Sequence, residues 1–576
     1  MGFCLLSYLT GYVYYNFWDL MKNKFIIILI LFISFSSLFS QDILEKGKLS
    51  GNFQLDAQYY QKDSIIGAQD VKEKILSNGY LYLNYTSGNF SMGMRYENYL
   101  NPILGIDPRY KGSGIAYRFA EFKSDMIEVT AGNFYEQFGS GLIFRAYEER
   151  LLGYDNAVDG IRMKFRPADG IELTGLIGNQ RSFWSTGKGI VRGGNSRFEL
   201  NTIFPALLPF QTTIEGSIIS KYQADQESFY NLPENVLAWS SKLSINASDF
   251  MIEGEYAYKY NDPSAANNFS FNPGKAFMLT ASYYPSGFGA TVNFHTIDNM
   301  DFRSDRDASL NNLNLNFIPP LTKQHIYRLA TLYPFATQLK GEIGVQAELT
   351  YTFPKNTLFG GDYGTTLALN YSQINSMDKT PLDVDTSNGH IYTYESSMFK
   401  FGDRLYFRDI NLELTKKWTK NIKSIFTFIN LVYDKDVMEY GSAPKYGKVN
   451  ATIAVAELTY LISKSQSLKT ELQHIWAKQD SAILTPDNVN GNWFMFLVEY
   501  TIAPSWYFTV FDEYNYGNDD ESRQLHYLNG SFAFIHEATR VQFGYGRQRG
   551  GLLCVGGVCR PVPASKGFFL SVSSTF

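Results

Sequence analysis

The chain has 576 residues, 16% of them aromatic and only 19% charged, with a net charge of −5. This acidic balance, without a long basic run, excludes a nucleic-acid-binding protein that grips phosphates. A mean hydropathy of −0.20 is too polar for a bundle of membrane helices. It suits a transmembrane β-barrel, in which only every second strand residue faces lipid.

The first apolar run is residues 25–39, which follow Lys22 and Lys24. A basic start, an apolar stretch of this length and a small residue before Gln41 are typical of a cleaved signal peptide. The run is too short for a good spanning helix, and an uncleaved N-terminal anchor is the alternative. The predicted organisation is an over-extended start (1–20), a signal peptide (21–40) and one outer-membrane barrel domain (41–576).

From Gln41 onward, apolar and polar residues alternate in short segments. In the first segment Leu49 and Phe53 share one face, and Asn52 and Asp56 share the other. Side chains alternate faces along a strand, so this is the pattern of a strand with one apolar face. The same period recurs at 90–97, 252–260 and 343–353. With no comparable helical period, the predicted fold class is all-β.

The connections between these segments alternate between short and long. Short turns at 124–125 and 167–170 are interleaved with long connections such as 98–112 and 297–340. Short turns on one rim and long loops on the other are typical of outer-membrane barrels. The sequence predicts a single large transmembrane antiparallel β-barrel of about 24 strands (roughly 22–26), with short periplasmic turns, long extracellular loops and both mature termini in the periplasm. Candidates for its aromatic girdles are Trp239, Trp476, Trp493 and Trp506.

Residues 131–166 form the most unusual stretch, because glycines punctuate a segment that is too apolar for a solvated loop. One interpretation is a segment folded into the lumen, whose charged side chains line a constriction. The other is a pair of longer strands joined by a glycine-kinked hairpin that rests on the wall.

The strand within this stretch carries cations on one face. Arg162, Lys164 and Arg166 lie opposite Ile161 and Met163, so they point inward if the apolar set faces lipid. With nearby carboxylates they could set up a transverse field that favours polar or anionic solutes. The alternative is that inward charges merely pair with one another. The pore-lining candidates are Glu136, Arg145, Glu148, Asp155, Asp159, Arg162, Lys164 and Arg166.

Motifs for metal binding and catalysis are not found. The acidic loops at 298–307 and 383–389 lack the ligand spacing of an EF-hand, which favours solvated charges over bound calcium. No nucleophile stands beside a base in a known catalytic motif. We expect no catalytic residue, no cofactor and no metal; an enzyme assembled on the barrel rim from distant residues stays a third possibility.

Cys554 and Cys559 flank Gly-Gly shortly before the last predicted strand. In an exported protein, such a close pair favours a disulfide. The spacing is not Cys-x-x-Cys, and the histidines supply no further zinc ligands. We expect a small disulfide-closed loop on the extracellular side.

The last ten residues, GFFLSVSSTF, alternate in the same way and end on Phe576. Such an ending resembles the bacterial outer-membrane β-barrel proteins, in which the terminal Phe is the signal read by the barrel-assembly machinery. The glycine-rich run followed by Asp-Asn-x-x-Asp-Gly at 155–160 is similar to that of porin-like and polysaccharide-export-like barrels. The mature chain thus resembles an uncharacterised family of large outer-membrane barrels from Bacteroidota. The resemblance implies contact with outer-membrane lipid and lipopolysaccharide, and it supplies no substrate.

These features predict a porin-like channel for small hydrophilic solutes in the bacterial outer membrane. The alternative is a non-conducting accessory subunit of a multi-protein outer-membrane machine for secretion or barrel assembly. Other outer-membrane or lipoprotein subunits would then be its partners. No nucleic-acid partner is expected.

Overall fold

The computed structural model describes residues 47–206, 209–227, 230–382, 393–441, 445–480 and 490–576. The predicted start, the signal peptide and the acidic loop at 383–389 lie outside the described residues. Among those described, no helix is long and apolar enough to cross a membrane.

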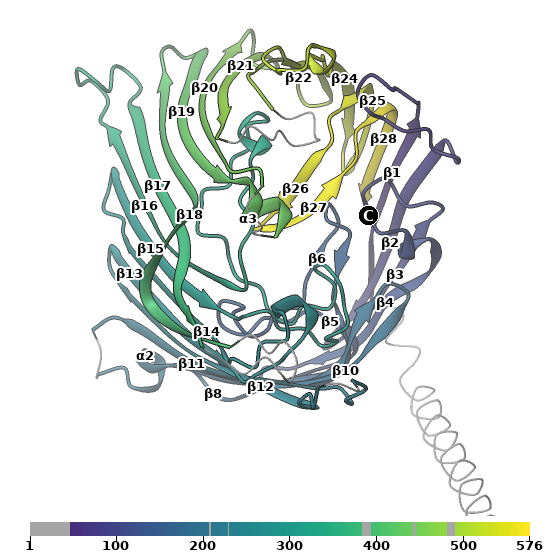
Figure 1. Ribbon diagram of the computed structural model, residues 1–576, viewed down its shortest axis with the longest axis vertical. Coiled ribbons are helices and arrows are strands. Elements are labelled where there is room, and N and C mark those ends of the chain that lie inside the picture. The colour runs from purple at the N-terminus through teal and green to yellow at the C-terminus, as the bar shows by residue number, and fades with distance from the viewer. Residues whose placement is uncertain (1–46, 207–208, 228–229, 383–392, 442–444, 481–489) are drawn as a thin grey trace, which may run out of the picture.

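One antiparallel sheet of 24 strands closes on itself and forms the wall of a barrel (Figure 1). Its strands are β1 (Lys48–Tyr60), β2 (Ile75–Ser87), β3 (Phe90–Tyr99), β4 (Gly112–Lys123), β5 (Ile127–Phe134), β8 (Val158–Ala168), β9 (Ile171–Ser182), β10 (Ser185–Glu199), β11 (Gln211–Tyr222), β12 (Asn235–Ala247), β13 (Phe250–Lys259), β14 (Gly274–Tyr283), β15 (Phe288–Asp298), β16 (Gly341–Phe353), β17 (Thr365–Pro381), β18 (Tyr394–Lys417), β19 (Ile422–Asp434), β20 (Lys448–Leu461), β21 (Gln466–Gln479), β22 (Trp493–Ile502), β23 (Trp506–Asn515), β24 (Asn529–His536), β25 (Thr539–Gln548) and β28 (Ser565–Thr575). The predicted fold class and strand number are confirmed.

Smaller elements lie in the connections. They are the two-stranded sheets β6 (Glu148–Glu149) with β7 (Tyr154–Asp155) and β26 (Gly551–Val555) with β27 (Val558–Val562), the helices α2 (Leu200–Ile203) and α3 (Lys435–Tyr440), and the 3₁₀ turns Pro108–Tyr110, Ala265–Asn267, Ala330–Leu332 and Glu521–Arg523.

The last strand closes the barrel by pairing with the first. Gln54 of β1 lies opposite Ser573 of β28, and Phe576 exchanges two backbone hydrogen bonds with Gly51. A Cβ atom at Gly51 would lie 2.3 Å from Cζ of Phe576, so the glycine leaves room for this ring. The role of Phe576 in assembly stays a prediction.

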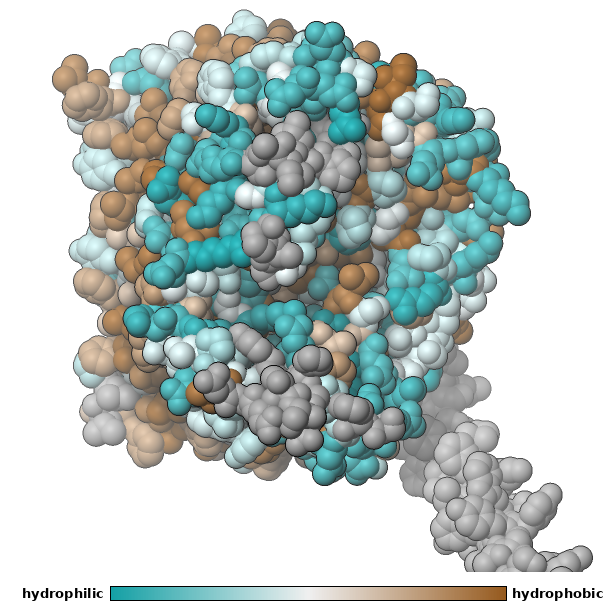
Figure 2. Space-filling view, in the orientation of Figure 1, coloured by the Kyte–Doolittle hydropathy of each residue, from teal (hydrophilic) through white to brown (hydrophobic). Residues whose placement is uncertain are grey.

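The outer face of the wall is apolar. On β8, Ile161 and Met163 are 54% and 42% exposed, whereas Arg162 between them points inward. Hydrophobic residues gather along the outer side of the wall in Figure 2. Trp239, Trp476 and Trp506 also lie on this face, but Trp493 is fully buried and packs against Tyr527 inside the barrel.

The two rims differ as the sequence predicts, with exceptions on each rim. The rim that carries the β2–β3 turn, where β1 also begins, has mostly short turns, and we call it the short-turn rim. The opposite rim, here the long-loop rim, carries long connections except between β9 and β10, which are joined by Phe183 and Trp184 alone. Because neighbouring strands run in opposite directions, the start of β1 and the end of β28 both lie at the short-turn rim.

Candidate functional site in the barrel lumen

Three connections from the long-loop rim turn back into the barrel, and we call them insert 1 (135–157), insert 2 (299–340) and insert 3 (549–564) (Figure 1). Each begins and ends at wall residues that face each other directly. These pairs are Phe134 with Val158, Asp298 with Gly341, and Gln548 with Ser565. The wall could therefore close across each gap with an ordinary hairpin turn, and the inserts are additions to the lumen.

Insert 1 and insert 2 share an apolar core on one side of the lumen. Phe138, Leu142 and Phe144 of insert 1 are at most 1% exposed. They cluster with Phe302 and Leu315 of insert 2 and with inward residues of the wall from β8 to β15. Burial of such side chains stabilises the folded state by roughly 1.5–3 kcal/mol each. Of the two interpretations of residues 131–166, the structure shows the inward-folded segment.

Backbone hydrogen bonds join the two inserts. The amide of Arg145 donates to the carbonyl of Leu315 at 2.7 Å, and the amide of Phe317 donates to the carbonyl of Gly141 at 3.0 Å. Gly141 adopts a φ of +93°, a conformation that side chains disfavour, so glycine permits the turn at the tip of insert 1. These bonds give some of the backbone N–H and C=O groups of both inserts hydrogen-bond partners inside the barrel.

The second half of insert 2 continues across the lumen. Leu329, Tyr333 and Phe335 pack in a second apolar cluster against inward residues of β17 to β22, including Ile429 and Trp493. The sequence predicts a long extracellular loop over 297–340, whereas the structure folds it into the lumen. The loop carries aromatic and aliphatic residues without a period of two, so the alternation that reveals strands gives no sign of its burial.

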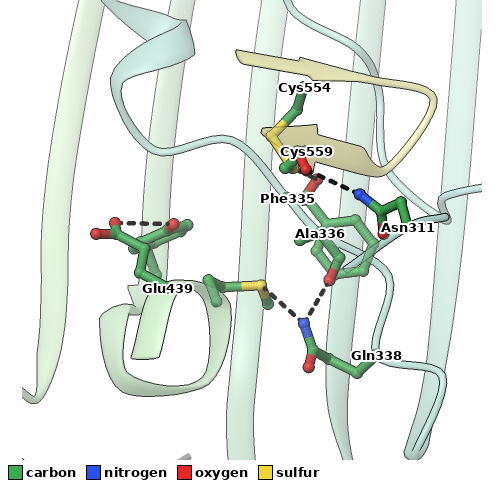
Figure 3. The surroundings of a disulfide bond; sticks show 9 residues. Asn311, Phe335, Ala336, Gln338, Glu439, Cys554 and Cys559 are labelled. Atoms are coloured by element: carbon green, nitrogen blue, oxygen red, sulfur yellow. Dashed lines mark hydrogen bonds between the residues drawn. A yellow bond between two sulfur atoms is a disulfide. The ribbon is translucent and has the colours of Figure 1, made fainter. Parts of the chain in front are cut away.

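Insert 3 contains the β26–β27 hairpin, and the structure has the predicted disulfide between Cys554 and Cys559. The sequence predicts this loop on the extracellular side; it begins at the long-loop rim but folds into the lumen (Figure 1). Its disulfide lies beside Asn311 and Phe335 of insert 2 (Figure 3). Asn311 donates to the carbonyl of Cys559 at 3.0 Å, and the amide of Thr337 donates to the carbonyl of Gly557 at 3.2 Å. Contact with insert 2 holds this apolar hairpin in the lumen.

The predicted pore-lining residues separate into two networks of buried charge. The first joins insert 1 to the wall through Asp155, which accepts hydrogen bonds from Arg95 and from Arg181, the latter at 2.6 Å. Arg95 also contacts Glu97 at 2.7 Å and Glu148 at 3.0 Å. Burial by itself would raise the pKa of Asp155, but Arg181 and Arg95 outweigh it and hold that pKa below its ordinary value of 3.8.

The second network centres on Arg162. Its guanidinium contacts Glu128 at 2.7 Å and both Glu121 and Glu136 at 3.2 Å. Lys164 contacts Glu136 at 2.8 Å. The inward cations of β8 therefore pair with carboxylates around them, which is the second of the two alternatives for these charges.

The remaining candidates lie apart from one another. Arg166 pairs with Glu172 at 2.7 Å, and Asp159 pairs with Arg118 at 3.1 Å. Arg145 stacks over the ring of Phe317, with 4.1 Å between the guanidinium carbon and the ring centroid.

A cavity of about 750 Å³ lies between the inserts and the inner wall at the barrel seam. Gln54 and Asp56 of β1 and Ser571 of β28 line one side of it. None of the eight predicted pore-lining residues is among the described residues that line it; Arg162 borders a separate cavity of about 830 Å³. The cations that line the first cavity are Arg150, Lys323, Arg328, Arg549 and Arg560.

Sequence reasoning missed these cations, although insert 3 carried a signal. Arg549 and Arg560 flank the cysteine hairpin, and no acidic residue stands between them in the sequence. Arg560 donates from Nε to the carbonyl of Leu151 at 2.9 Å. Burial lowers the pKa of its guanidinium below the ordinary value.

Within the described part of the chain, no group of three or more His, Cys, Asp or Glu side chains is placed to hold a metal ion. Of the acidic loop at 298–307, Asp298 accepts hydrogen bonds from Tyr394 and Ser396, both at 2.6 Å, and Asp301 pairs with Arg303 at 2.9 Å. These carboxylates are buried partners of protein groups and not solvated charges.

Residues 21–576 match the model of DUF6029, a family of unknown function. No curated protein matches the chain. Among solved structures, the siderophore receptor PirA from Pseudomonas aeruginosa is similar with 9% identity and a TM-score of 0.39, over 92% of this chain and 80% of that one. A mutant of the ferric enterobactin receptor PfeA from the same organism, in complex with enterobactin, is similar with 10% identity and a TM-score of 0.44, over 92% of this chain and 81% of that one. OpdL from Pseudomonas aeruginosa is similar with 12% identity and a TM-score of 0.33, over 76% of this chain and 100% of that one.

Proposed function

The chain belongs to the DUF6029 family, whose function is unknown, so we propose from the barrel itself that it is a porin-like channel for small hydrophilic solutes in the bacterial outer membrane. Both wall ends of the chain would lie in the periplasm, and the long-loop rim would face outward. Folding there requires the barrel-assembly machinery, and the apolar outer face would contact lipid and lipopolysaccharide.

The observation that carries this proposal is the cavity at the barrel seam, which is partly lined by polar side chains. A wall of 24 strands encloses a lumen wide enough for water unless it is filled. The inserts fill the side of the lumen near β8 to β22 with apolar cores. Polar side chains such as Gln54, Gln58 and Ser571 line the cavity that remains. A solute path along this seam would be narrow and hydrophilic.

A specific observation also favours the accessory-subunit alternative. Inserts 1 and 2 fill much of the lumen with apolar cores, and such filling is also expected in a barrel that does not conduct. The two functions therefore differ in whether the inserts narrow the lumen or close it.

Single-channel conductance in planar bilayers separates these functions. Because Gln548 faces Ser565, insert 3 can be replaced by Asn-Gly, which forms a two-residue hairpin turn. We expect small steady conductance from the mature protein and larger conductance from this variant. The matched control replaces residues 354–364 on the short-turn rim, whose flanking residues Phe353 and Thr365 also face each other. It should conduct like the unaltered protein.

Other outcomes would change the assignment. Silence in the unaltered protein with conductance after excision of insert 3 would mean a closed barrel and favour the accessory subunit. Silence in both, with the barrel shown to be folded by its heat-dependent mobility in gels, would contradict transport.

A further inference from the structure

The cavity at the barrel seam is lined by more cations than carboxylates. Five cationic side chains border it, whereas Asp56 is its one carboxylate among the described residues. Asp56 accepts hydrogen bonds from Gln54 and Ser571, both at 2.7 Å, so its charge is already solvated by the wall.

Carboxylates behind the lining neutralise only part of this charge. Arg328 and Arg549 share a single carboxylate, that of fully buried Glu513, with 3.1 Å between Arg549 Nε and Glu513 Oε2. Lys323 pairs with Glu413 at 3.6 Å, and Arg150 pairs with Glu148, which also contacts Arg95. Two guanidinium groups for one carboxylate leave a positive excess on this side of the cavity.

Arg560 adds a cation without a carboxylate partner. Within the described residues its side chain has no ion pair, and its buried Nη1 donates no hydrogen bond. The backbone of Gly105 approaches so closely that a Cβ atom there would lie 2.2 Å from Nη1. A buried guanidinium N–H that lacks an acceptor is costly, and an anion bound at this guanidinium would offset the cost.

Other side chains of the lining are apolar. Ile326 of insert 2 and Leu151 of insert 1 line the cavity and are 87% and 63% exposed. An inorganic ion would leave these side chains in contact with water alone. A solute with an apolar body and an anionic end would contact both them and the cations, and about 750 Å³ accommodates such a molecule.

We propose that this cavity is a binding site for small organic anions, with Arg560 as the guanidinium that contacts the anionic oxygens. The inference rests on the proposed function in one respect, because it makes organic anions the solutes that the channel passes. Binding itself does not require conduction, so the two can fail separately.

Equilibrium dialysis of the purified full barrel in detergent tests the site. Benzoate and phenyl phosphate serve as probes that distinguish a carboxylate from a phosphate ligand, and benzamide is the neutral counterpart of benzoate. We expect benzoate, phenyl phosphate or both to bind at least tenfold more tightly than benzamide. Arg560→Gln should weaken binding about tenfold or more, as expected for the loss of a charge-assisted hydrogen bond. Arg560→Lys should restore part of it.

The matched control is Arg192→Gln, which removes a guanidinium on β10 that contacts Asn235 and does not line the cavity. It should bind as the unaltered protein does. Equal binding of benzamide and benzoate, no binding of either anion, or equal weakening by Arg192→Gln and Arg560→Gln would overturn the proposal. Anion binding in a barrel that is silent in bilayers would keep the site and contradict the channel. Conduction without anion binding would keep the channel and contradict the binding site.

Discussion

At the scale of single residues, Asp155 is the carboxylate that ties insert 1 to the wall. Arg95 and Arg181 are both at most 5% exposed and both contact it. Removing one partner of a buried ion pair costs roughly 3–5 kcal/mol, because the other charge stays buried. We therefore expect Asp155→Ala to lower the free energy of unfolding, measured by denaturant titration with tryptophan fluorescence, by an amount in this range.

The control for this substitution is Asp107→Ala. Asp107 pairs with Arg109, whose side chain is 54% exposed, and exposed pairs contribute about 1 kcal/mol or less. Similar losses in the two variants would contradict a structural role for the Asp155 network.

The same residue sets a pH dependence. Since the pKa of folded Asp155 lies below its ordinary value of 3.8, its contribution to stability is complete above that value and is lost as pH falls through the lower folded pKa. The stability difference between the unaltered protein and Asp155→Ala should stay constant from about pH 5 to pH 8 and shrink below about pH 4. A difference that already fades near pH 6 would point to another group.

The charges of β8 show what sequence can predict about single residues. The alternation of Ile161, Arg162 and Met163 predicts which way each side chain points, because strand geometry fixes it. It does not predict partners, because Glu121 and Glu136 reach Arg162 from β4 and insert 1. The eight candidates all belong to the one charged stretch 131–166, whereas the cavity at the barrel seam is lined by cations from three inserts.

At the scale of elements, the β26–β27 hairpin depends on its disulfide. Closing so short a loop stabilises a fold by roughly 2 kcal/mol. We expect two alkyl groups to add per mature chain, which lacks Cys4, and only after reduction, as intact mass measures. Backbone amides of 551–562 should then exchange hydrogen faster, while those of β25 and β28 stay unchanged.

The double variant Cys554→Ser with Cys559→Ser serves as a control, because it should exchange like the reduced protein. Free thiols before reduction would contradict the disulfide. Faster exchange throughout β25 and β28 would show instead that the hairpin supports the wall.

The wall strands could be predicted and the inserts could not, for a physical reason. A wall strand separates lipid from the lumen, so its two faces differ in polarity and leave a period of two in the sequence. An insert is enclosed on several sides, so Phe138, Leu142 and Phe302 follow no single period. Insert 1 is detectable because it is too apolar for a loop. In insert 2 the apolar residues are dispersed among polar ones, and insert 3 is a short apolar segment whose cysteine pair predicts a disulfide loop but not its inward fold.

At the scale of the whole molecule, the apolar outer face defines a membrane band. Leu412 faces outward in the interior of β18, away from both ends of the strand, and is 42% exposed. Leu49 also faces outward but is the second residue of β1, beside the short-turn rim, and is 62% exposed. Lysine on a lipid-facing site costs roughly 2–4 kcal/mol at the bilayer centre and about 1 kcal/mol or less near the interface. We expect Leu412→Lys to destabilise the barrel in vesicles more than Leu49→Lys does. Equal costs would contradict the placement of the band.

The pairing of β1 with β28 also governs when the protein can become complete. Gln54 and Ser573 are neighbours across the seam but are separated by almost the whole chain. One edge of β1 therefore has no partner until β28 has been synthesised. An unpaired strand edge invites pairing with other chains, so this edge needs protection until β28 reaches it. Closure cannot precede the synthesis of β28, and a chain that lacks β28 keeps two open edges however well the other strands pair.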